Sequence, residues 1–230
     1  MVDRSSLRDG KPVHEFKRLM RSRSVIVEVG AHDGATTEGF HALFPRARII
    51  AFEPEPRAID KFKARHALRG VTLIECAVGD RNGNVVFHRC SGEAPGHPGI
   101  DWDASGSIHE PGETRTLHPW LKFDEDITVP IVRLDDELAR QGVGPVDLIW
   151  ADVQGAEREL IDGARETLKR TRYFYTECTD APEYIGQIGL QDMCTMLPDF
   201  EIVEVFAYDV LFRNKNGQLH GRWRRWLGRM

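Results

Sequence analysis

The stretch VIVEVGAHDG, residues 25–34, decides the fold of this chain. It is an apolar run that stops on Gly30, and a second glycine, Gly34, follows shortly after. Such a run is typical of a buried strand in a parallel sheet, and the glycines indicate a tight turn from that strand into a helix. Because glycine has no Cβ atom, the turn allows a ligand to approach the backbone closely. The sequence therefore predicts a strand, turn and helix with a ligand at the turn.

The residues between the two glycines indicate which kind of ligand to expect. The dinucleotide fingerprint GxGxxG has its first two glycines two residues apart, and His32 stands here at the second of these positions. A nicotinamide or flavin cofactor is therefore disfavoured. Glu28, two residues before Gly30, together with the GxxxG spacing of Gly30 and Gly34, is instead the pattern of methyltransferases that bind S-adenosylmethionine.

A carboxylate at the end of the second expected strand supports the same ligand. Glu53 follows the run IIAF and lies close to the ~20 residues after Gly30 at which a ribose carboxylate is expected. There it can accept hydrogen bonds from both ribose hydroxyls of an adenosine. The alternative is that the glycines only form a tight turn and that Glu53 caps the helix begun by Pro54 or Pro56.

Length and composition fit one soluble α/β domain over residues 1–230. The chain has a net charge of -5, so nucleic-acid binding would need a local basic patch, and we expect none. Its 4 cysteines show no CxxC pair and no metal-type spacing, which indicates reduced thiols. The start is polar, and no stretch approaches the ~20 apolar residues of a membrane span, so we expect a cytoplasmic protein without integral membrane contact.

Apolar runs alternate with helical patterns, which predicts a seven-stranded, mostly parallel sheet with helices on both faces. The last two runs, EIVEVFA and DVLFRN, form a hairpin that makes the last strand antiparallel. We expect NGNVVFHRC and DITVPIVRL to pair as a further antiparallel addition. Expected strands are 24–30, 47–53, 71–78, 146–153, 172–178, 201–207 and 209–214, and expected helices are near 36–43, 56–68, 134–142, 156–169 and 183–196.

Three segments lie outside this alternation. Residues 1–23 form an expected N-terminal helical extension, and residues 215–230 form a basic tail for which we favour a frayed terminus or an oligomer contact over a membrane surface. Residues 91–126 are rich in glycine, proline and polar side chains, so we expect a long loop that closes over the active site.

The successive motifs resemble the FkbM family of S-adenosylmethionine-dependent methyltransferases from about residue 24 to residue 180. The most specific block is ADVQGAERELIDGA, in which Asp152, Gly155, Glu157 and the Gly163-Ala164 pair stand where the family has them. The resemblance implies a class I Rossmann-like methyltransferase fold, S-adenosylmethionine as methyl donor, and O-methylation of sugars or secondary metabolites. The other matching blocks are VIVEVGAHDG, IIAFEPEP, IECAVGDRNGNVVF, VPIVRLDDEL and YTEC.

The chain departs from the family pattern at two positions. The common GAN after the first strand is GAH here, ending on His32, and Gln154 replaces a frequent glutamate. The second change removes a carboxylate, so the role of that acid does not carry over to this chain.

Methylation of an alcohol needs a base for the hydroxyl proton. Asp152 and Glu177 end expected strands on the same side of the sheet as Glu53, so we take them as catalytic candidates. The alternatives are a helix N-cap for Asp152 and a salt-bridged strand end for Glu177. Glu157 falls in the first turn of a helix, where we read it as structural. His97, His109 and His118 are further base candidates in the loop.

We therefore expect an O-methyltransferase acting on a hydroxyl of a sugar, glycan or glycosylated metabolite, with a homodimer left open. Two alternatives remain: a non-catalytic S-adenosylmethionine-binding module in a biosynthetic complex, and a Rossmann NAD-dependent oxidoreductase. We expect no metal, because no ligand spacing is recognisable. The expected cofactor-binding residues are Glu28, Gly30, Ala31, His32, Gly34, Glu53, Pro54, Ala77, Val78 and Asp152.

Overall fold

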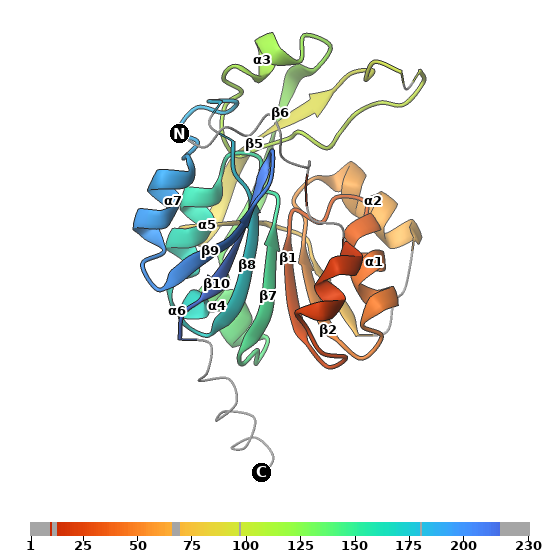
Figure 1. The fold of residues 1–230 in the computed structure, drawn as a ribbon. Coiled ribbons are helices and arrows are strands. Elements are labelled where there is room, and N and C mark those ends of the chain that lie inside the picture. Colours follow the sequence, from red (N-terminus) through yellow and green to blue (C-terminus); the bar gives the residue numbers. More distant parts are fainter. Residues whose placement is uncertain (1–9, 11–12, 66–69, 97, 180, 217–230) are drawn as a thin grey trace.

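A twisted seven-stranded sheet forms the centre of the molecule in the computed structural model, which describes residues 10, 13–65, 70–96, 98–179 and 181–216 (Figure 1). The strand order is β3-β2-β1-β7-β8-β10-β9. These strands are β1 (Val25–Val29), β2 (Arg48–Phe52), β3 (Val71–Ile74), β7 (Val146–Ala151), β8 (Thr171–Glu177), β9 (Phe200–Val205) and β10 (Asp209–Asn214).

The sheet is parallel from β3 to β8, and β10 runs antiparallel between β8 and β9. The expected terminal hairpin and the antiparallel last strand are thus confirmed. In β1 every residue after Val25 is buried, as an apolar strand covered on both faces requires. The expected mostly parallel seven-stranded sheet is confirmed as well.

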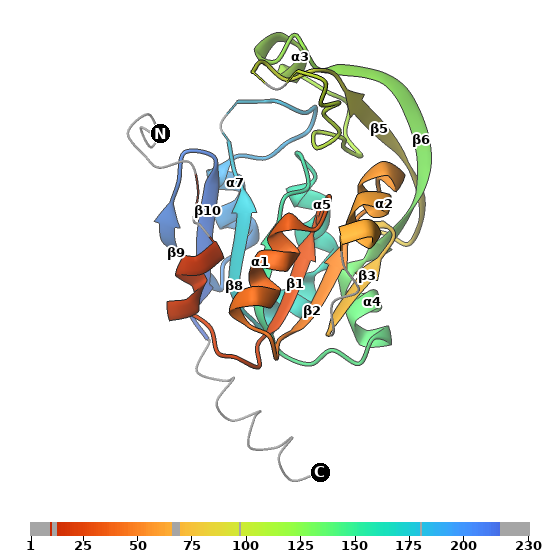
Figure 2. The same cartoon turned by 90° about the vertical axis from the view of Figure 1, so that its right-hand side faces the viewer.

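Helices cover both faces of this sheet, as expected. One face carries the 3-10 helix η1 (Val13–Arg18), α1 (Ala35–Leu43) and α2 (Pro56–Arg65), and the aromatic rings of Phe16 and Phe40 pack there at 6.0 Å between centroids. The other face carries α4 (Leu134–Arg140), α5 (Glu157–Gly163), α6 (Arg165–Lys169) and α7 (Leu190–Met196), which bury the larger apolar core. Figure 2 shows α1 in front of the strands.

A second, three-stranded sheet has the strand order β4-β6-β5. Its strands are β4 (Ala77–Gly79), β5 (Gly83–Ser91) and β6 (Lys122–Arg133). The antiparallel pairing of β5 with β6 confirms the expected addition. The expected single strand 71–78 is wrong, because the chain leaves the main sheet after Ile74 and β4 pairs with β6 instead. This transfer brings Ala77 and Val78 to the end of the sheet where the parallel strands finish.

The segment between β5 and β6, residues 92–121, is called the cap loop here, and residue 97 within it lies outside the described part. It is shorter than the expected 91–126, because pairing extends both strands, and it contains α3 (Thr114–Leu117). Figure 2 shows the segment around α3 beyond the ends toward which the arrows of β1 and β8 point. The cap loop is therefore placed at the carboxyl ends of the parallel strands.

Other expectations were less accurate. The single helix expected at 156–169 is two helices, α5 and α6, and only residues 190–196 of the helix expected at 183–196 are helical. Of the N-terminal extension, residues 1–9 and 11–12 lie outside the described residues, as do residues 217–230 of the basic tail. Among the helices that the structure describes, none combines the length and apolarity needed to cross a bilayer.

Candidate active site

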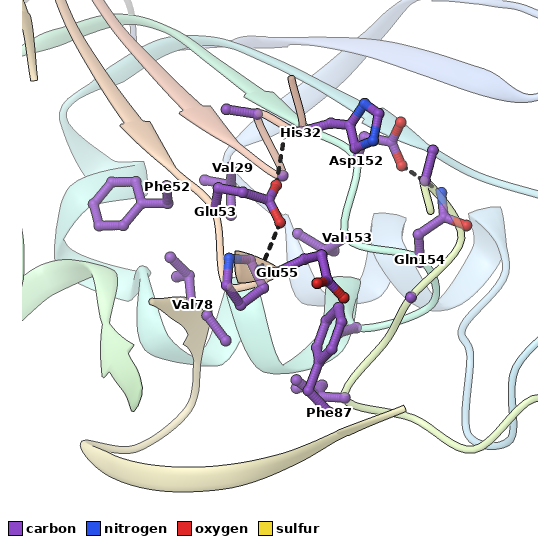
Figure 3. Close-up of a pocket in the computed structure, with 18 of the residues that line it drawn as sticks. Val29, His32, Phe52, Glu53, Glu55, Val78, Phe87, Asp152, Val153 and Gln154 are labelled. Carbon is purple, nitrogen blue, oxygen red and sulfur yellow. Dashed lines mark hydrogen bonds between the residues drawn. The ribbon is translucent and has the colours of Figure 1, made fainter. Parts of the chain in front are cut away.

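A cavity of about 300 Å³ opens at the carboxyl ends of β1, β2 and β7 (Figure 3). The turn after β1, the end of β2, β4 and the cap loop all contribute to its wall. This is the position at which parallel α/β sheets bind ligands. The cavity brings together eight of the expected cofactor-binding residues, namely Gly30, Ala31, His32, Glu53, Pro54, Ala77, Val78 and Asp152.

The two glycines of the first turn are required by the protein's own packing. Both have a left-handed backbone, with φ +80° at Gly30 and φ +81° at Gly34. A Cβ atom on Gly30 would stand 1.9 Å from the carbonyl oxygen of Asp152, and one on Gly34 would stand 2.7 Å from the ring of Phe62. The bare backbone thus lets the end of β7 lie against the turn after β1, which places Asp152 at the cavity.

Glu28 and Gly34 lie outside the residues that line the cavity. The carboxyl group of Glu28 is buried and accepts a hydrogen bond from the hydroxyl of Thr37 in α1. Burial raises the pKa of Glu28 to about 8. In the structure this acid therefore ties β1 to α1 next to the cavity.

Glu53 lies at the cavity wall with its carboxylate held by two backbone donors. The N–H of His32 donates to Oε2 at 2.7 Å, and the N–H of Glu55 donates to Oε1 at 2.9 Å (Figure 3). Burial raises the pKa of Glu53 to about 7. In the first turn of α2, which begins at Pro56, the N–H of Arg57 donates to the carboxylate of Glu55 rather than to that of Glu53.

The two expected catalytic acids are joined through one side chain. The amide Nε2 of Gln154 lies 2.6 Å from Oδ1 of Asp152 and 3.2 Å from Oε2 of Glu177. Asp152 lines the cavity. Glu177 does not line the cavity, but its carboxyl group contacts Gln154, which does. Desolvation by the surrounding protein raises the pKa of both acids, and repulsion from Asp152 raises that of Glu177 further. Because the pKa of Glu177 is raised by repulsion from Asp152 as well as by desolvation, a proton taken up by the pair favours Glu177 over Asp152.

Gln154 itself is fixed by contacts that the sequence did not indicate. Its backbone is left-handed, with φ 51°, and its carbonyl oxygen accepts the hydroxyl of Ser107 at 2.6 Å. The hydroxyl of Tyr184 lies 2.8 Å from Oε1 of Gln154. Only the exchange of the family's glutamate for Gln154 pointed to this position. Nothing in the sequence linked it to Tyr184, which is distant along the chain.

Asp103 of the cap loop is a second cavity residue that sequence reasoning missed. It accepts hydrogen bonds from Nε2 of His32 at 2.8 Å and from Nζ of Lys61 at 2.6 Å. These bonds outweigh burial and hold the pKa of Asp103 well below its usual range. For His32, burial acts to lower the pKa, but the bond to Asp103 outweighs it and raises the pKa. The cap loop is thus tied to the turn that lines the cofactor cavity.

Of the loop histidines, neither His109 nor His118 lines the cavity. His109 donates from Nδ1 to the carbonyl oxygen of Ile185 at 2.6 Å and pairs through Nε2 with Glu159 at 3.0 Å, so both ring nitrogens are engaged. The ring of His118 packs against Trp120 at 6.0 Å. His97 lies outside the described residues. Within the described ranges, no three His, Cys, Asp or Glu side chains form a metal-binding group.

Glu157, read from the sequence as structural, lies in the first turn of α5 and is almost fully buried. Neither of its carboxyl oxygens has a hydrogen-bond partner among the described residues. Burial raises the pKa of Glu157 to about 8. The group is therefore protonated at neutral pH, which agrees with a place inside the protein.

The strand order of the main sheet, the antiparallel hairpin of β9 and β10 at its edge and the cavity lined by acids together define a class I Rossmann-like methyltransferase. The model of the FkbM methyltransferase domain matches residues 28–230. The chain belongs to this family and is an S-adenosylmethionine-dependent methyltransferase, which sets aside the oxidoreductase and the non-catalytic module.

Two relatives and one solved structure illustrate the similarity. The 2-O-methyltransferase NoeI of Sinorhizobium fredii (strain NBRC 101917 / NGR234) is 40% identical over 201 residues, which is 85% of this chain and 82% of NoeI. The 31-O-demethyl-FK506 methyltransferase FkbM of Streptomyces tacrolimicus is 26% identical over 184 residues, 74% and 70% of the two chains. A putative rRNA methylase from Clostridium thermocellum aligns with a TM-score of 0.49 at 9% identity, over 88% of this chain and 92% of that chain.

The residues of the cavity fit S-adenosylmethionine. A carboxylate fixed by two backbone donors, Glu53, suits the ribose hydroxyls of an adenosine. Ala77 and Val78 present small apolar side chains suited to a flat aromatic base, and Gly30 and Ala31 of the turn line the same cavity. Asp152, directly after β7, lines the same cavity as these groups (Figure 3).

Proposed function

We propose that this protein transfers a methyl group to a hydroxyl oxygen of a sugar, a glycan or a glycosylated metabolite. The observation that carries the proposal is the pair of acids Asp152 and Glu177 bridged by Gln154 at the cofactor cavity, because an alcohol acceptor needs a proton acceptor there. The names of the relatives NoeI and FkbM, each an O-methyltransferase, support an oxygen as the acceptor atom. Carboxylates also suit the several hydroxyl groups of a sugar.

In this proposal Asp152 is the general base. When bound, S-adenosylmethionine supplies a methyl group that leaves its sulfonium while the S–C bonding pair stays on the sulfur. Asp152 takes the proton that the acceptor oxygen loses as the new C–O bond forms. Desolvation by the surrounding protein raises the pKa of Asp152, which makes it a stronger base than an aspartate in bulk water. In this proposal Glu177, whose pKa is raised by desolvation and by repulsion from Asp152, holds the proton of the pair, so that the negative charge lies on Asp152.

The cofactor contacts are proposed for the residues that line the cavity. Glu53 accepts hydrogen bonds from the ribose hydroxyls, and Ala77 and Val78 flank the adenine. Residues 30–32 and Pro54 contact the remaining part of the cofactor. The cap loop supplies the wall on the acceptor side through Asp103, Ala104 and Gly106. It excludes water from the reacting atoms and selects the acceptor.

Methyl transfer from labelled S-adenosylmethionine over a panel of neutral glycosides tests this function. We expect label in the sugar of at least one glycoside, with a new O-methyl signal by NMR. Calorimetric titration with S-adenosylmethionine and its demethylated product provides the matching binding data. The proposal would be wrong if the protein bound the cofactor tightly and labelled no glycoside, but labelled an amine or a carboxyl compound. The acceptor would then be an amine or a carboxylate.

We also infer a cytoplasmic protein that acts without nucleic acid. Burial raises the pKa of Cys76 to about 12 and that of Cys90 to about 11, which suits inert thiols in a reducing compartment. The net charge of -5 supports the second inference. For the homodimer left open by the sequence, light scattering of the whole chain gives the answer directly.

A further inference from the structure

The cap loop carries a group of exposed apolar side chains that the proposed function does not use. Ile100, Trp102 and Leu117 are 56%, 37% and 50% exposed, although side chains of this size are more often buried. Exposed apolar side chains that lie together commonly mark a binding surface, and all three belong to the cap loop. The cap loop also supplies residues to the active-site cavity, so the surface borders the site.

Three aromatic rings of this surface have a defined geometry. The indoles of Trp102 and Trp120 meet edge to face, with centroids 5.7 Å apart and an interplanar angle of 89°. The ring of His118 stands 6.0 Å from Trp120 on the same loop. We call Trp102, His118 and Trp120 the aromatic corner. Nε1 of Trp102 donates to the hydroxyl of Ser105 at 3.0 Å, which fixes the orientation of this partly exposed ring.

A short chain of contacts links the aromatic corner to the catalytic acids. The backbone carbonyl oxygen of Ser105 lies 2.8 Å from the hydroxyl of Tyr184, and the same hydroxyl lies 2.8 Å from Oε1 of Gln154. Trp120 packs against the buried cluster of Cys90, Leu121, Phe123 and Tyr184. The residue after Trp102 is Asp103, which lines the cavity. The corner is thus continuous with the wall of the active site.

We propose that the aromatic corner is an acceptor subsite that stacks against a neutral pyranose next to the sugar that carries the methylated hydroxyl. A pyranose presents C–H groups on one face and hydroxyls around its rim, so it needs a fixed aromatic face bordered by polar groups. The corner offers this combination, because Asp101 and Asp103 precede and follow Trp102 in the chain. Asp101 is paired with Arg57 and Asp103 with Lys61, so the polar groups beside Trp102 are charge-compensated, which suits a neutral sugar. This inference rests on the proposed function.

Direct binding tests the subsite without depending on turnover. Saturation-transfer NMR is recorded with cellobiose, lactose and isomaltose on the protein saturated with the demethylated cofactor, with octanoate as the apolar probe. We expect transfer to sugar C–H protons, and a rise in the apparent Kd of about tenfold in Trp102→Ala. Trp102→Phe keeps an aromatic face and should restore most of the binding. Ile202→Ala, another exposed apolar side chain on β9, is the matched control with unchanged binding.

The outcomes separate the subsite from the proposed function. Absence of sugar binding to the unaltered protein, or equal binding by Trp102→Ala, overturns the subsite. If octanoate binds in a way that depends on Trp102 and the sugars do not bind, the aromatic corner is a site for an apolar chain and the sugar subsite is wrong. If the corner variants methylate glycosides as well as the unaltered protein does, the subsite is wrong and the proposed function stands. Circular dichroism and cofactor titration confirm in each variant that the fold and the cofactor cavity are retained.

Discussion

The side-chain amide of Gln154 donates to the carboxylate of Asp152 at 2.6 Å and stands 3.2 Å from the carboxyl group of Glu177. One neutral donor therefore holds two acids that would otherwise repel each other. When the pair holds one proton, the short hydrogen bond from the amide to Asp152 favours the arrangement in which Asp152 is the ionised partner. The exchange of the family's glutamate for glutamine thus has a physical role in this chain.

Asp152→Asn should lower kcat by about 10²-fold or more and leave the affinity for S-adenosylmethionine within about threefold. The asparagine keeps the size of the side chain and removes the proton acceptor. Single-turnover transfer and calorimetric titration measure the two quantities separately. Near-normal turnover would move the base to Glu177, and Glu177→Gln is the matched variant that decides this.

Gln154→Glu should shift the acidic limb of the pH profile of kcat upward by about one unit. A third carboxylate replaces the donor beside Asp152 and Glu177, and like charges raise the pKa of the group. Turnover at pH 7 then falls and recovers in part at pH 9. Tyr184→Phe is the control, because it removes the hydroxyl at Oε1 of Gln154 and leaves the amide donor in place. A shift of equal size in both variants would assign the effect to lost packing.

Glu53→Gln should weaken S-adenosylmethionine binding by about tenfold, because the amide group cannot accept both ribose hydroxyls and carries no charge. The isosteric change keeps an acceptor for one of the N–H groups of His32 and Glu55, whereas alanine would leave both without one. Isothermal calorimetry gives the affinity, and thermal unfolding without ligand reports the cost to the fold. Unchanged affinity in a folded variant would place the ribose elsewhere.

Glu157→Gln should make the stability of the protein less dependent on pH. Burial raises the pKa of Glu157 from 4.5 to about 8, so the folded protein holds a proton that the unfolded chain releases. The stability linked to this group is fully present below pH 4.5 and is lost as pH rises toward 8, by at most about 1.4 kcal/mol per pH unit. Urea unfolding at pH 5 and pH 8 measures the difference. An equally steep loss in the variant would contradict the protonated buried state.

His109→Phe should raise the acceptor KM severalfold with little change in cofactor affinity, because the ring anchors the cap loop to Glu159 of α5 and to Ile185. The hydrogen bond with Glu159 raises the pKa of His109. The contribution of this pair to stability is therefore fully present below pH 6.5 and is lost as pH rises through the raised pKa. Steady-state kinetics at pH 6 and pH 9 should show the acceptor KM of the unaltered protein rising toward that of the variant.

The sequence alone determined the main sheet, its strand positions and the residues at the ends of its buried strands. Those features are local, because apolar periodicity and glycine punctuation specify strands, and the parallel arrangement then brings Gly30, Glu53 and Asp152 to one edge. Where a run had two possible neighbours, sequence was insufficient. The run 71–78 reads as one strand, yet β4 is defined by pairing with β6, which is far away along the chain.

Only the tertiary structure decided the environment of each polar group. Position 30 requires glycine because a Cβ atom there would collide with the carbonyl oxygen of Asp152. Gln154 is hydrogen-bonded to Glu177 and Tyr184, which are far from it in the sequence. The raised pKa of Asp152 follows from desolvation, which no residue has by itself. Local pattern fixes what a strand end carries, whereas burial and long-range contacts fix its charge and its partners.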